Sequence, residues 1–416
     1  MNAFTYKDGW LHAENVSLEA LAATHGTPLY VYSRGALRTA YRALAEAMRP
    51  LDPLICYSVK ANSNLAVLQT FVEEGAGLDI VSGGELFRAL KAGANPQKIV
   101  FAGVGKTREE IRYALQQDIL FFTVESEPEV RRISDCAVES GRTGRIAFRI
   151  NPNVDPQTHT YISTGKQENK FGLDIERTIK AYDMAARLPG IEIAGLHMHI
   201  GSQILSADPF AQAIIKIRKL CATLRDTYPT FRHLDIGGGI GIQYEPGDVP
   251  LDSNTYAEMV ANALGGLDLK LVIEPGRSLV GNAGILLTRV EYIKDNPFKK
   301  FVVADVGMND LIRPSLYQAY HAISAVRETL ETMKGDLVGP ICESGDFIAQ
   351  DRQLPAVGDG DLLAIRSAGA YAFTMASTYN SRPLPAEVMV DGDTARVVRK
   401  RGTLEGIVAD EHAFDA

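Results

Sequence analysis

The chain has few of the residues that build extracellular scaffolds, zinc sites or membrane spans. Among its 416 residues are four cysteines and one tryptophan. The cysteines lie far apart without any C-x-x-C spacing, which argues against a disulfide framework or a zinc knuckle. No stretch approaches the ~18 uninterrupted apolar residues of a membrane helix. Residues 1–15 lack both the basic region and the apolar segment of a signal peptide, so we expect a cytoplasmic protein.

The chain also lacks a basic surplus. Its formal net charge is -8, from 43 Lys and Arg against 51 Asp and Glu, with no long basic run. Nucleic acids and anionic membranes are bound by positive patches, so neither is an expected partner. A hydrophobic content of 46% with 23% charged residues is ordinary for a globular chain of two or three domains. We therefore expect small molecules as partners.

What the chain does have is a regular alternation of short apolar runs and amphipathic segments. A helical segment at 36–48 is followed by eight strand-like runs, each trailed by an amphipathic stretch of roughly 10 to 15 residues. Eight such units in about 240 residues predict a (β/α)8 TIM barrel, with a doubly wound open sheet as the competing α/β architecture. The expected strands are 54–60, 78–81, 99–102, 120–124, 146–150, 193–199, 233–236 and 271–274.

The alternation stops after residue 281, and β-like runs with turn residues between them follow. They predict a second, mainly β domain, either a sandwich or a barrel. The N-terminal segment, with a helix at 18–25 and a strand at 29–32, would complete it. We therefore expect a barrel over 35–281 and a mainly β domain from 1–34 and 282–416. The expected strands after the barrel are 285–293, 301–306, 362–366 and 387–390, with one helix at 314–320 and a final strand and tail at 401–416.

One long polar insertion interrupts the alternation. Residues 151–174 follow the fifth expected strand and carry the sequence GKQENKFG. Long insertions at the carboxyl ends of barrel strands are usually lids or subunit contacts, and we expect one of these roles here.

A barrel collects its reactive side chains at the carboxyl ends of its strands, and chemistry-bearing residues do fall there. Lys60 ends the first run, where a desolvated amine could form a Schiff base with a carbonyl. His199 ends the sixth, with Ser202 just beyond it: a flat ring and a hydroxyl that suit an aromatic cofactor and its phosphate. Glycines at 237–239 follow the seventh, where backbone N–H groups could face a phosphate.

Glu274 and Arg277 close the eighth run. A carboxylate there could keep a pyridine nitrogen protonated, and an arginine could bind a substrate carboxylate. Alternatively, the two side chains pair with each other. His197 lies two residues before His199, on the same side of the strand, and we interpret it as a core histidine. A metal-dependent barrel hydrolase is the competing interpretation of the two imidazoles, together with His233 and Asp235.

The second domain contributes further candidates. Arg313 and Tyr317 are four residues apart, so they share a helical face and could hold a carboxylate together. Cys342 stands beside Glu343 in a turn, where the thiol could be a proton donor or simply a buried cysteine. Tyr371 adds a phenol that could reach a phosphate.

Together these motifs resemble the fold-type III pyridoxal-phosphate decarboxylases, whose barrel is like that of alanine racemase. The resemblance covers nearly the whole chain. It is carried by six ordered motifs, YSVKAN at 57–62, HIGS at 199–202, GGG at 237–239, EPGR at 274–277, RPSLY at 313–317 and CESGD at 342–346. Leu384 is a departure, because an arginine is more usual there.

The resemblance implies pyridoxal 5'-phosphate as the cofactor. Lys60 would form the Schiff base with it, His199 would stack on the pyridine ring and Glu274 would face the ring nitrogen. We place the rest of the cofactor site at Asp79, Ser202, Gly238, Gly239, Gly276, Arg277 and Tyr371.

The resemblance also implies the reaction, which is decarboxylation of meso-2,6-diaminopimelate at its D-centre to give L-lysine and carbon dioxide. Lys60, His199 and Cys342 would be catalytic, with Cys342 taking part in reprotonation of Cα. Cys342 and Glu343 would come from the partner subunit of a homodimer with shared active sites. The distal end of the substrate would meet Arg277, Arg313, Tyr317, Glu343 and Tyr371.

Other activities of the same fold stay open from the residues alone. A decarboxylase of ornithine, lysine, arginine or carboxynorspermidine would favour an acidic residue where Arg313 stands. An alanine-racemase-like enzyme would set a cation, not Glu274, against the pyridine nitrogen. A catalytically silent pyridoxal-phosphate-binding protein would lack Lys60 or Cys342, and both are present.

Overall fold

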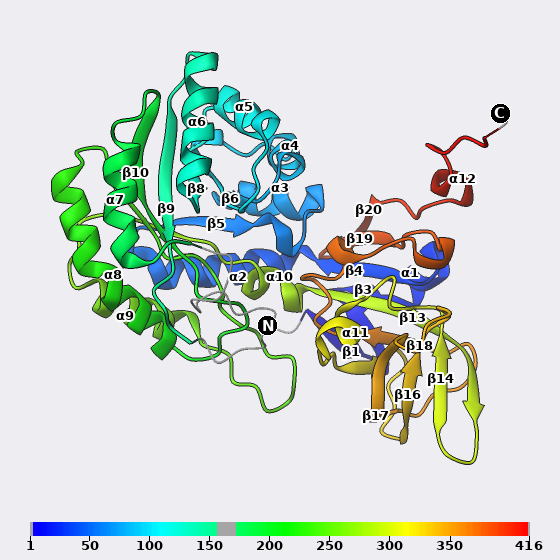
Figure 1. Ribbon diagram of the computed structural model, residues 1–416. Helices are drawn as coiled ribbons and strands as arrows, with labels where there is room; N and C mark the ends of the chain where they lie inside the picture. Colours follow the sequence, from blue (N-terminus) through cyan, green and yellow to red (C-terminus); the bar gives the residue numbers. More distant parts are fainter. Residues whose placement is uncertain (1–2, 156–171, 415–416) are drawn as a thin grey trace. The chain divides into compact units, whose positions relative to one another are not determined.

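The computed structural model describes residues 3–155 and 172–414, drawn in Figure 1. The chain divides into two compact units. We call Ala40–Gln243 with Asp248–Leu279 the barrel unit, and Met1–Thr39 with Tyr244–Gly247 and Val280–Ala416 the β unit. Residues 156–171, most of the predicted insertion, lie outside the described part of the chain.

The barrel unit is built on the closed parallel sheet that the alternation predicted, which confirms the TIM barrel over the open sheet. The strand order is β10-β11-β12-β5-β6-β7-β8-β9, and β12 closes the ring by pairing Val272 with Leu54 and Ile273 with Ile55. The strands are β5 (Leu54–Ser58), β6 (Gly77–Ile80), β7 (Ile99–Phe101), β8 (Phe121–Val124), β9 (Gly144–Ile150), β10 (Ile191–Met198), β11 (His233–Asp235) and β12 (Lys270–Ile273).

Helices alternate with these strands in the chain (Figure 1). Most begin at a side chain that accepts a hydrogen bond from the first turn, as at Thr107, whose capping box includes Glu110. The helices are α2 (Arg34–Met48), α3 (Leu65–Glu73), α4 (Gly83–Lys91), α5 (Arg108–Gln117), α6 (Glu127–Ser140), α7 (Ile175–Ala185), α8 (Asp208–Thr227), α9 (Ser253–Leu264) and α10 (Arg277–Val280).

The interior of the barrel is apolar in one layer and polar in another. Cys56, Val100, Phe121, Ala147, Ala194 and Val272 form a buried cluster contributed by six strands. Each large apolar side chain buried there stabilises the fold by roughly 1.5–3 kcal/mol. At the carboxyl ends of the strands the buried residues are instead ionisable, including Asp79, His197, Asp235 and Glu274. These groups cost stability unless they are paired, so their presence marks a site.

The first strand is shorter than predicted. It was expected to run to Lys60, but β5 ends at Ser58 and Val59–Ala61 forms the 3-10 turn η2. The pairing with β6 stops at Ser58, opposite Asp79, and the Ser58 N–H turns to the carbonyl of Pro275. Lys60 therefore projects from a turn at the rim of the barrel and not from the ladder.

The β unit contains one large sheet that joins the two ends of the chain, as predicted. Its main path is β17-β16-β14-β13-β4-β19-β20, with β18 pairing β13 and β15. Strand β4 (Leu29–Ser33) is antiparallel to β13 and parallel to β19. The other strands are β13 (Gly284–Asp295), β14 (Lys300–Ala304), β15 (Ile323–Ala325), β16 (Thr332–Val338), β17 (Phe347–Pro355), β18 (Leu362–Ile365), β19 (Ala386–Asp391) and β20 (Thr394–Arg399).

Smaller elements complete the β unit. Strands β1 (Phe4–Lys7), β2 (Trp10–Ala13) and β3 (Val16–Ser17) form a separate three-stranded sheet before helix α1 (Leu18–His25). The helix predicted at 314–320 is the shorter α11 (Arg313–Tyr317), because Gln318 has a φ of 52° and ends it.

The strand predicted within 401–416 is wrong. Thr403 instead caps a short helix, α12 (Leu404–Ile407), by accepting a hydrogen bond from the Gly406 N–H at 3.0 Å. Of the helices within 3–155 and 172–414, none combines the length and the apolar character needed to cross a bilayer.

Candidate active site

Lys60 is held at the rim of the barrel by a buried carboxylate. Its Nζ donates to Asp79 Oδ2 at 2.5 Å, and the Ser58 hydroxyl donates to the same oxygen at 2.8 Å. Asp79 is fully buried. Burial and the nearby Glu274 raise the pKa of Asp79, whereas Lys60 and Ser58 oppose that rise. The pair places an amine at the mouth of the barrel with its direction fixed.

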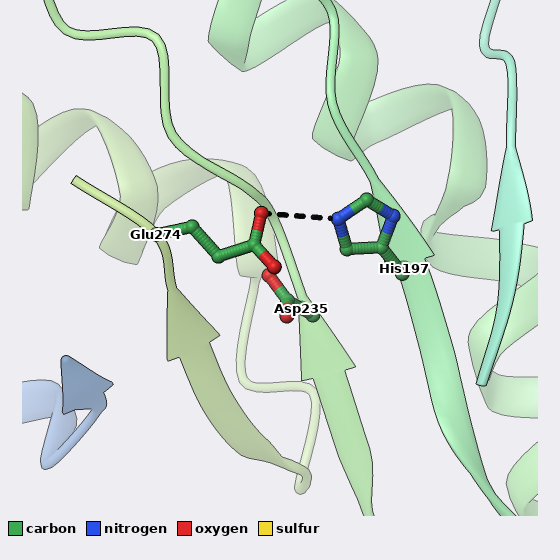
Figure 2. A group of neighbouring side chains, drawn as sticks. All are labelled: His197, Asp235 and Glu274. Atoms are coloured by element: carbon green, nitrogen blue, oxygen red, sulfur yellow. Dashed lines mark hydrogen bonds and ion pairs between the residues drawn. The ribbon is translucent and has the colours of Figure 1, made fainter. Parts of the chain in front are cut away.

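A second buried group lies at the ends of three adjacent strands. His197 comes from β10, Asp235 ends β11 and Glu274 follows β12 (Figure 2). One ligand atom of each lies within 4.8 Å of the others. His197 Nε2 donates to Glu274 Oε2 at 3.2 Å, and Asp235 Oδ1 accepts from the Gly237 N–H at 2.8 Å. His197 is buried, as predicted for a core histidine, but its partner is the predicted cofactor carboxylate.

The two carboxyl groups of this cluster divide one negative charge and one proton between them. Burial acts to raise the pKa of Glu274, but His197, Lys60 and His199 together lower it well below its usual range. Burial and the neighbouring Glu274 raise the pKa of Asp235 far above its usual range. Both side chains are buried, and two ionised carboxylates this close would repel each other. Asp235 therefore carries the proton and Glu274 carries the charge.

His199 presents a neutral ring at the end of β10. The Gly238 N–H donates to its Nδ1 at 3.2 Å, so Nδ1 is the acceptor and Nε2 bears the hydrogen. Burial lowers the pKa of His199 well below its usual value, and Arg149 and Lys60 lower it further. A neutral, oriented imidazole suits contact with the face of an aromatic ring.

The glycine run makes a surface that other residues could not make. Gly239 has a φ of 110°, and a Cβ there would lie 2.3 Å from the Gly201 carbonyl oxygen. A Cβ on Gly238 would lie 2.0 Å from the Glu274 carbonyl oxygen. Arg277 Nη2 donates to the Ser202 hydroxyl at 2.9 Å, so two predicted phosphate and substrate residues lie together.

These residues fit pyridoxal 5'-phosphate. Glu274 is buried and carries a negative charge, as a carboxylate that faces a protonated ring nitrogen must. Lys60 would supply an amine for the aldehyde, and the backbone N–H groups of the glycine run would bind the phosphate. A Cβ on Gly276 would lie 3.0 Å from Ser58 Cβ, so that turn also accepts only glycine without adjustment.

The β unit carries the remaining predicted residues. Arg313 and Tyr317 lie on α11, with the Arg313 guanidinium 5.7 Å from the centre of the Tyr317 ring and 5.2 Å from that of Tyr244. Arg313 is 6% exposed, so the helix pair is not the solvated surface that such spacing commonly gives. Tyr371 lies after β18 with a φ of 54°.

Cys342 and Glu343 are exposed in the loop between β16 and β17. The Cys342 N–H donates to Asn380 Oδ1 at 2.9 Å, and the Tyr379 hydroxyl donates to Glu343 Oε2 at 3.1 Å. The exposed thiol contradicts the alternative of a buried cysteine. The Ser315 hydroxyl donates to the Gly345 carbonyl at 2.5 Å, so the RPSLY and CESGD motifs, far apart in sequence, are adjacent within the β unit.

Four residues were not predicted to be part of the cofactor or substrate site. Asp235 lies two residues before the glycine run, but nothing in the sequence shows that it faces Glu274. His197 had the spacing of a site residue and was assigned to the core. Tyr379 lies 36 positions from Glu343 and carries no motif. His321 follows α11 and contacts Arg313, a pairing that periodicity does not reveal.

Comparisons with known proteins agree with this site. Residues 34–281 match the family described as pyridoxal-dependent decarboxylase, pyridoxal binding domain. The chain is 49% identical to the diaminopimelate decarboxylase of Pseudomonas aeruginosa over 99% of both chains. Its fold matches that of the diaminopimelate decarboxylase of Helicobacter pylori complexed with L-lysine, with a TM-score of 0.91 and 44% identity. The match covers 94% of this chain and 98% of that one. For the M. jannaschii enzyme, also solved with L-lysine, the TM-score is 0.94 and the identity is 37%. The match covers 99% of this chain and 98% of that one.

The chain therefore belongs to the pyridoxal-dependent decarboxylases, a class of enzymes that use pyridoxal phosphate, and within them to the diaminopimelate decarboxylases. This membership decides against the metal-dependent hydrolase. His197, Asp235 and Glu274 form a buried polar cluster at the strand ends.

Proposed function

We propose that the chain removes the carboxylate from the D-centre of meso-2,6-diaminopimelate, giving L-lysine and carbon dioxide in the last step of lysine biosynthesis. The observation that carries the proposal is the pairing of Lys60 with buried Asp79 beside a charged, buried Glu274. An amine for an aldehyde and an anion for a ring nitrogen are the two groups that pyridoxal-phosphate decarboxylation requires. Full-length similarity to diaminopimelate decarboxylases supports the same reaction.

Bound pyridoxal phosphate supplies an electron sink that accepts the electron pair of the breaking Cα–carboxylate bond. Glu274 keeps its negative charge with the help of His197 and so favours a proton on the ring nitrogen. His199 would place its neutral imidazole against a face of the ring. Asp79 directs the Lys60 amine through its ion pair with it. Ser202, Gly238, Gly239, Gly276, Arg277 and Tyr371 are proposed to complete the cofactor site.

Selectivity for the substrate is proposed to lie at its distal end. The distal amino-acid centre of diaminopimelate carries a carboxylate as well as an amine. Arg277, Arg313 and Tyr317 offer donors to that carboxylate, and Glu343 offers an anion to the amine. An ornithine-type substrate has only the amine and would gain nothing from Arg313.

We further propose that Cys342 protonates Cα after carbon dioxide leaves. The exposed thiol on the loop after β16 supports this role, because a side chain that acts in another subunit must stand on the surface of its own. The active form would then be a homodimer in which each site takes Cys342 and Glu343 from the partner. The acidic net charge supports an enzyme without nucleic-acid or anionic-membrane partners, and we propose that it is cytoplasmic.

The reaction is tested by incubating the protein with meso-diaminopimelate, with and without pyridoxal phosphate. We expect equal amounts of L-lysine and carbon dioxide, and only with the cofactor. Lys60→Ala should abolish turnover together with the imine absorption band. Full activity of this variant, or a product other than L-lysine, would contradict the proposal.

The shared site has its own test. Lys60→Ala and Cys342→Ala are each expected to be inactive as pure dimers. After mixing and subunit exchange, about half of the dimers are mixed and hold one intact site of two, so roughly a quarter of the wild-type activity should return. If activity stays absent although exchange is demonstrated, each site is built from a single chain.

A further inference from the structure

A buried histidine of the β unit contacts the proposed substrate arginine. His321 has no exposed surface. Its Nδ1 lies 2.8 Å from the carbonyl oxygen of Arg366, which can only accept, so Nδ1 carries the hydrogen. Its Nε2 is then an acceptor, and Arg313 Nε donates to it at 3.4 Å. The hydrogen bond to Arg366 thus fixes which nitrogen faces Arg313.

The position of the His321 ring is fixed by its surroundings. Its own carbonyl accepts from Arg352 Nη1 at 2.8 Å. The Arg366 N–H donates to the Ala322 carbonyl at 2.7 Å, which ties the chain after His321 to the end of β18. The ring also meets the Tyr244 ring edge to face, at 5.4 Å and 77°. The acceptor offered to Arg313 is therefore rigid.

Arg313 is held by a hydrogen bond from its Nε and by contact of its guanidinium with an aromatic ring. Tyr244 lies 5.2 Å from the guanidinium carbon, so one aromatic ring contacts both Arg313 and His321. An arginine loses rotamer freedom when it binds a ligand in one orientation. A guanidinium that is oriented in advance has already lost most of it, and the ligand binds more tightly for that reason.

We infer that His321 is a positioning residue that orients Arg313 for the distal carboxylate of the substrate. The inference rests on the proposed function and deepens it. The neutrality of the acceptor matters. A carboxylate at position 321 would also orient Arg313, but it would compete with the substrate for the positive charge. A neutral imidazole orients the guanidinium and leaves its charge for the ligand.

The experiment compares His321→Phe with His321→Gln. Phenylalanine keeps a ring against Tyr244 and removes the acceptor, whereas glutamine places an amide oxygen near the position of Nε2. For His321→Phe we expect the KM for meso-diaminopimelate to rise about tenfold or more, with kcat within about threefold of the wild type. His321→Gln should recover most of that KM.

Binding of the product L-lysine and of cadaverine, an analogue of it without a carboxylate, separates orientation of Arg313 from general damage. L-lysine retains the distal carboxylate, whereas cadaverine lacks it. Measured as competitive inhibitors, L-lysine should weaken about tenfold in His321→Phe, in parallel with the KM, and cadaverine should not change. His12→Phe is the matched control, because His12 also bonds a carbonyl, that of Trp10 at 2.9 Å, within the β unit. It should leave KM, kcat and both inhibition constants unchanged.

The outcomes are distinguishable. Equal weakening of L-lysine and cadaverine, or a loss in kcat without a change in KM, would overturn the positioning role. So would a KM in His321→Phe equal to that of the wild type, provided that the wild type forms L-lysine. If the wild type forms no L-lysine from meso-diaminopimelate, the proposed function itself is wrong.

Discussion

Replacing Asp235 by asparagine tests how charge is distributed at the base of the cofactor site. Asp235 is fully buried, and its Oδ1 accepts from the Gly237 N–H. Asparagine has nearly the same shape, keeps an acceptor for Gly237 and places an N–H group where the carboxyl proton lies. If Asp235 is neutral in the native enzyme, the substitution should have little effect on activity.

The magnitude follows from the geometry. The interacting atoms of Asp235 and Glu274 lie within 4.8 Å of each other. Two full charges at that distance repel by at least about 3 kcal/mol at an effective dielectric constant of ~20. Burial adds to this cost and raises the pKa of Asp235. An ionised Asp235 would therefore be strongly disfavoured, and the loss of its charge on substitution removes nothing that the native state uses.

Activity, absorbance and thermal unfolding measure the effect. We expect Asp235→Asn to keep kcat/KM within about threefold and to keep the cofactor absorption band, whereas Glu274→Gln should lose on the order of a hundredfold or more. A raised pKa in the folded state means that the native protein holds a proton that the unfolded chain releases. Wild-type stability therefore falls as pH rises above the usual range of an aspartate. The Tm of Asp235→Asn relative to wild type should rise between pH 5 and pH 8.

The reasoning would be refuted by a variant that folds, binds the cofactor and is as inactive as Glu274→Gln. That result would mean that Asp235 works as an anion. A Tm difference that stays constant with pH would independently show that Asp235 titrates alike in the folded and unfolded states.

Two further substitutions test other parts of the structure. Gly238→Ala puts a Cβ 2.0 Å from the Glu274 carbonyl oxygen, so the turn must shift. We expect the affinity for the cofactor to fall at least about tenfold in an equilibrium titration. An unchanged affinity would mean that this backbone does not touch the cofactor. Burial raises the pKa of Asp310 from 3.8 to about 7, so the native protein loses stability as pH rises between these values. In urea titrations, Asp310→Asn should reduce this dependence of the free energy of unfolding on pH. An unchanged pH dependence would contradict the burial argument.

The barrel was predictable because its strands are buried on both faces. Such strands appear in the sequence as short apolar runs, and the predicted limits agree with the structure within a few residues for all eight. β7 was expected at 99–102 and is Ile99–Phe101, and α1 was expected at 18–25 and is Leu18–His25. A helix stop at Gly26 and the turn residues between strands gave these limits.

The strands that the sequence missed lie where one or both faces meet solvent. β16 and β17 carry exposed charged and polar residues, so neither shows an apolar run. β1 to β3 are at most four residues long. The short pairings of such strands are set by tertiary contacts, which override local propensity.

The candidate site, too, was predictable only in part. Which residues stand at strand ends is a property of the chain order, so Lys60, His199 and Glu274 could be selected one by one. Which of them share a proton or a hydrogen bond depends on packing across the barrel, and the role of Asp235 followed only from its distance to Glu274. For the same reason the sequence gives no indication that His321 faces Arg313.

In each unit a charged side chain of the candidate site lies beside a neutral polar one. Glu274 must stay ionised in a buried setting, and the group beside it, Asp235, is a neutral acid that adds no second charge. Arg313 must offer its charge to a ligand, and the group beside it, His321, faces it with a neutral acceptor nitrogen. A charged partner would hold either residue more strongly but would also cancel or repel the charge that the reaction uses. Neutral polar partners orient a charged group without consuming its charge, so at positions 235 and 321 the hydrogen-bonding shape of the side chain matters and added charge is harmful.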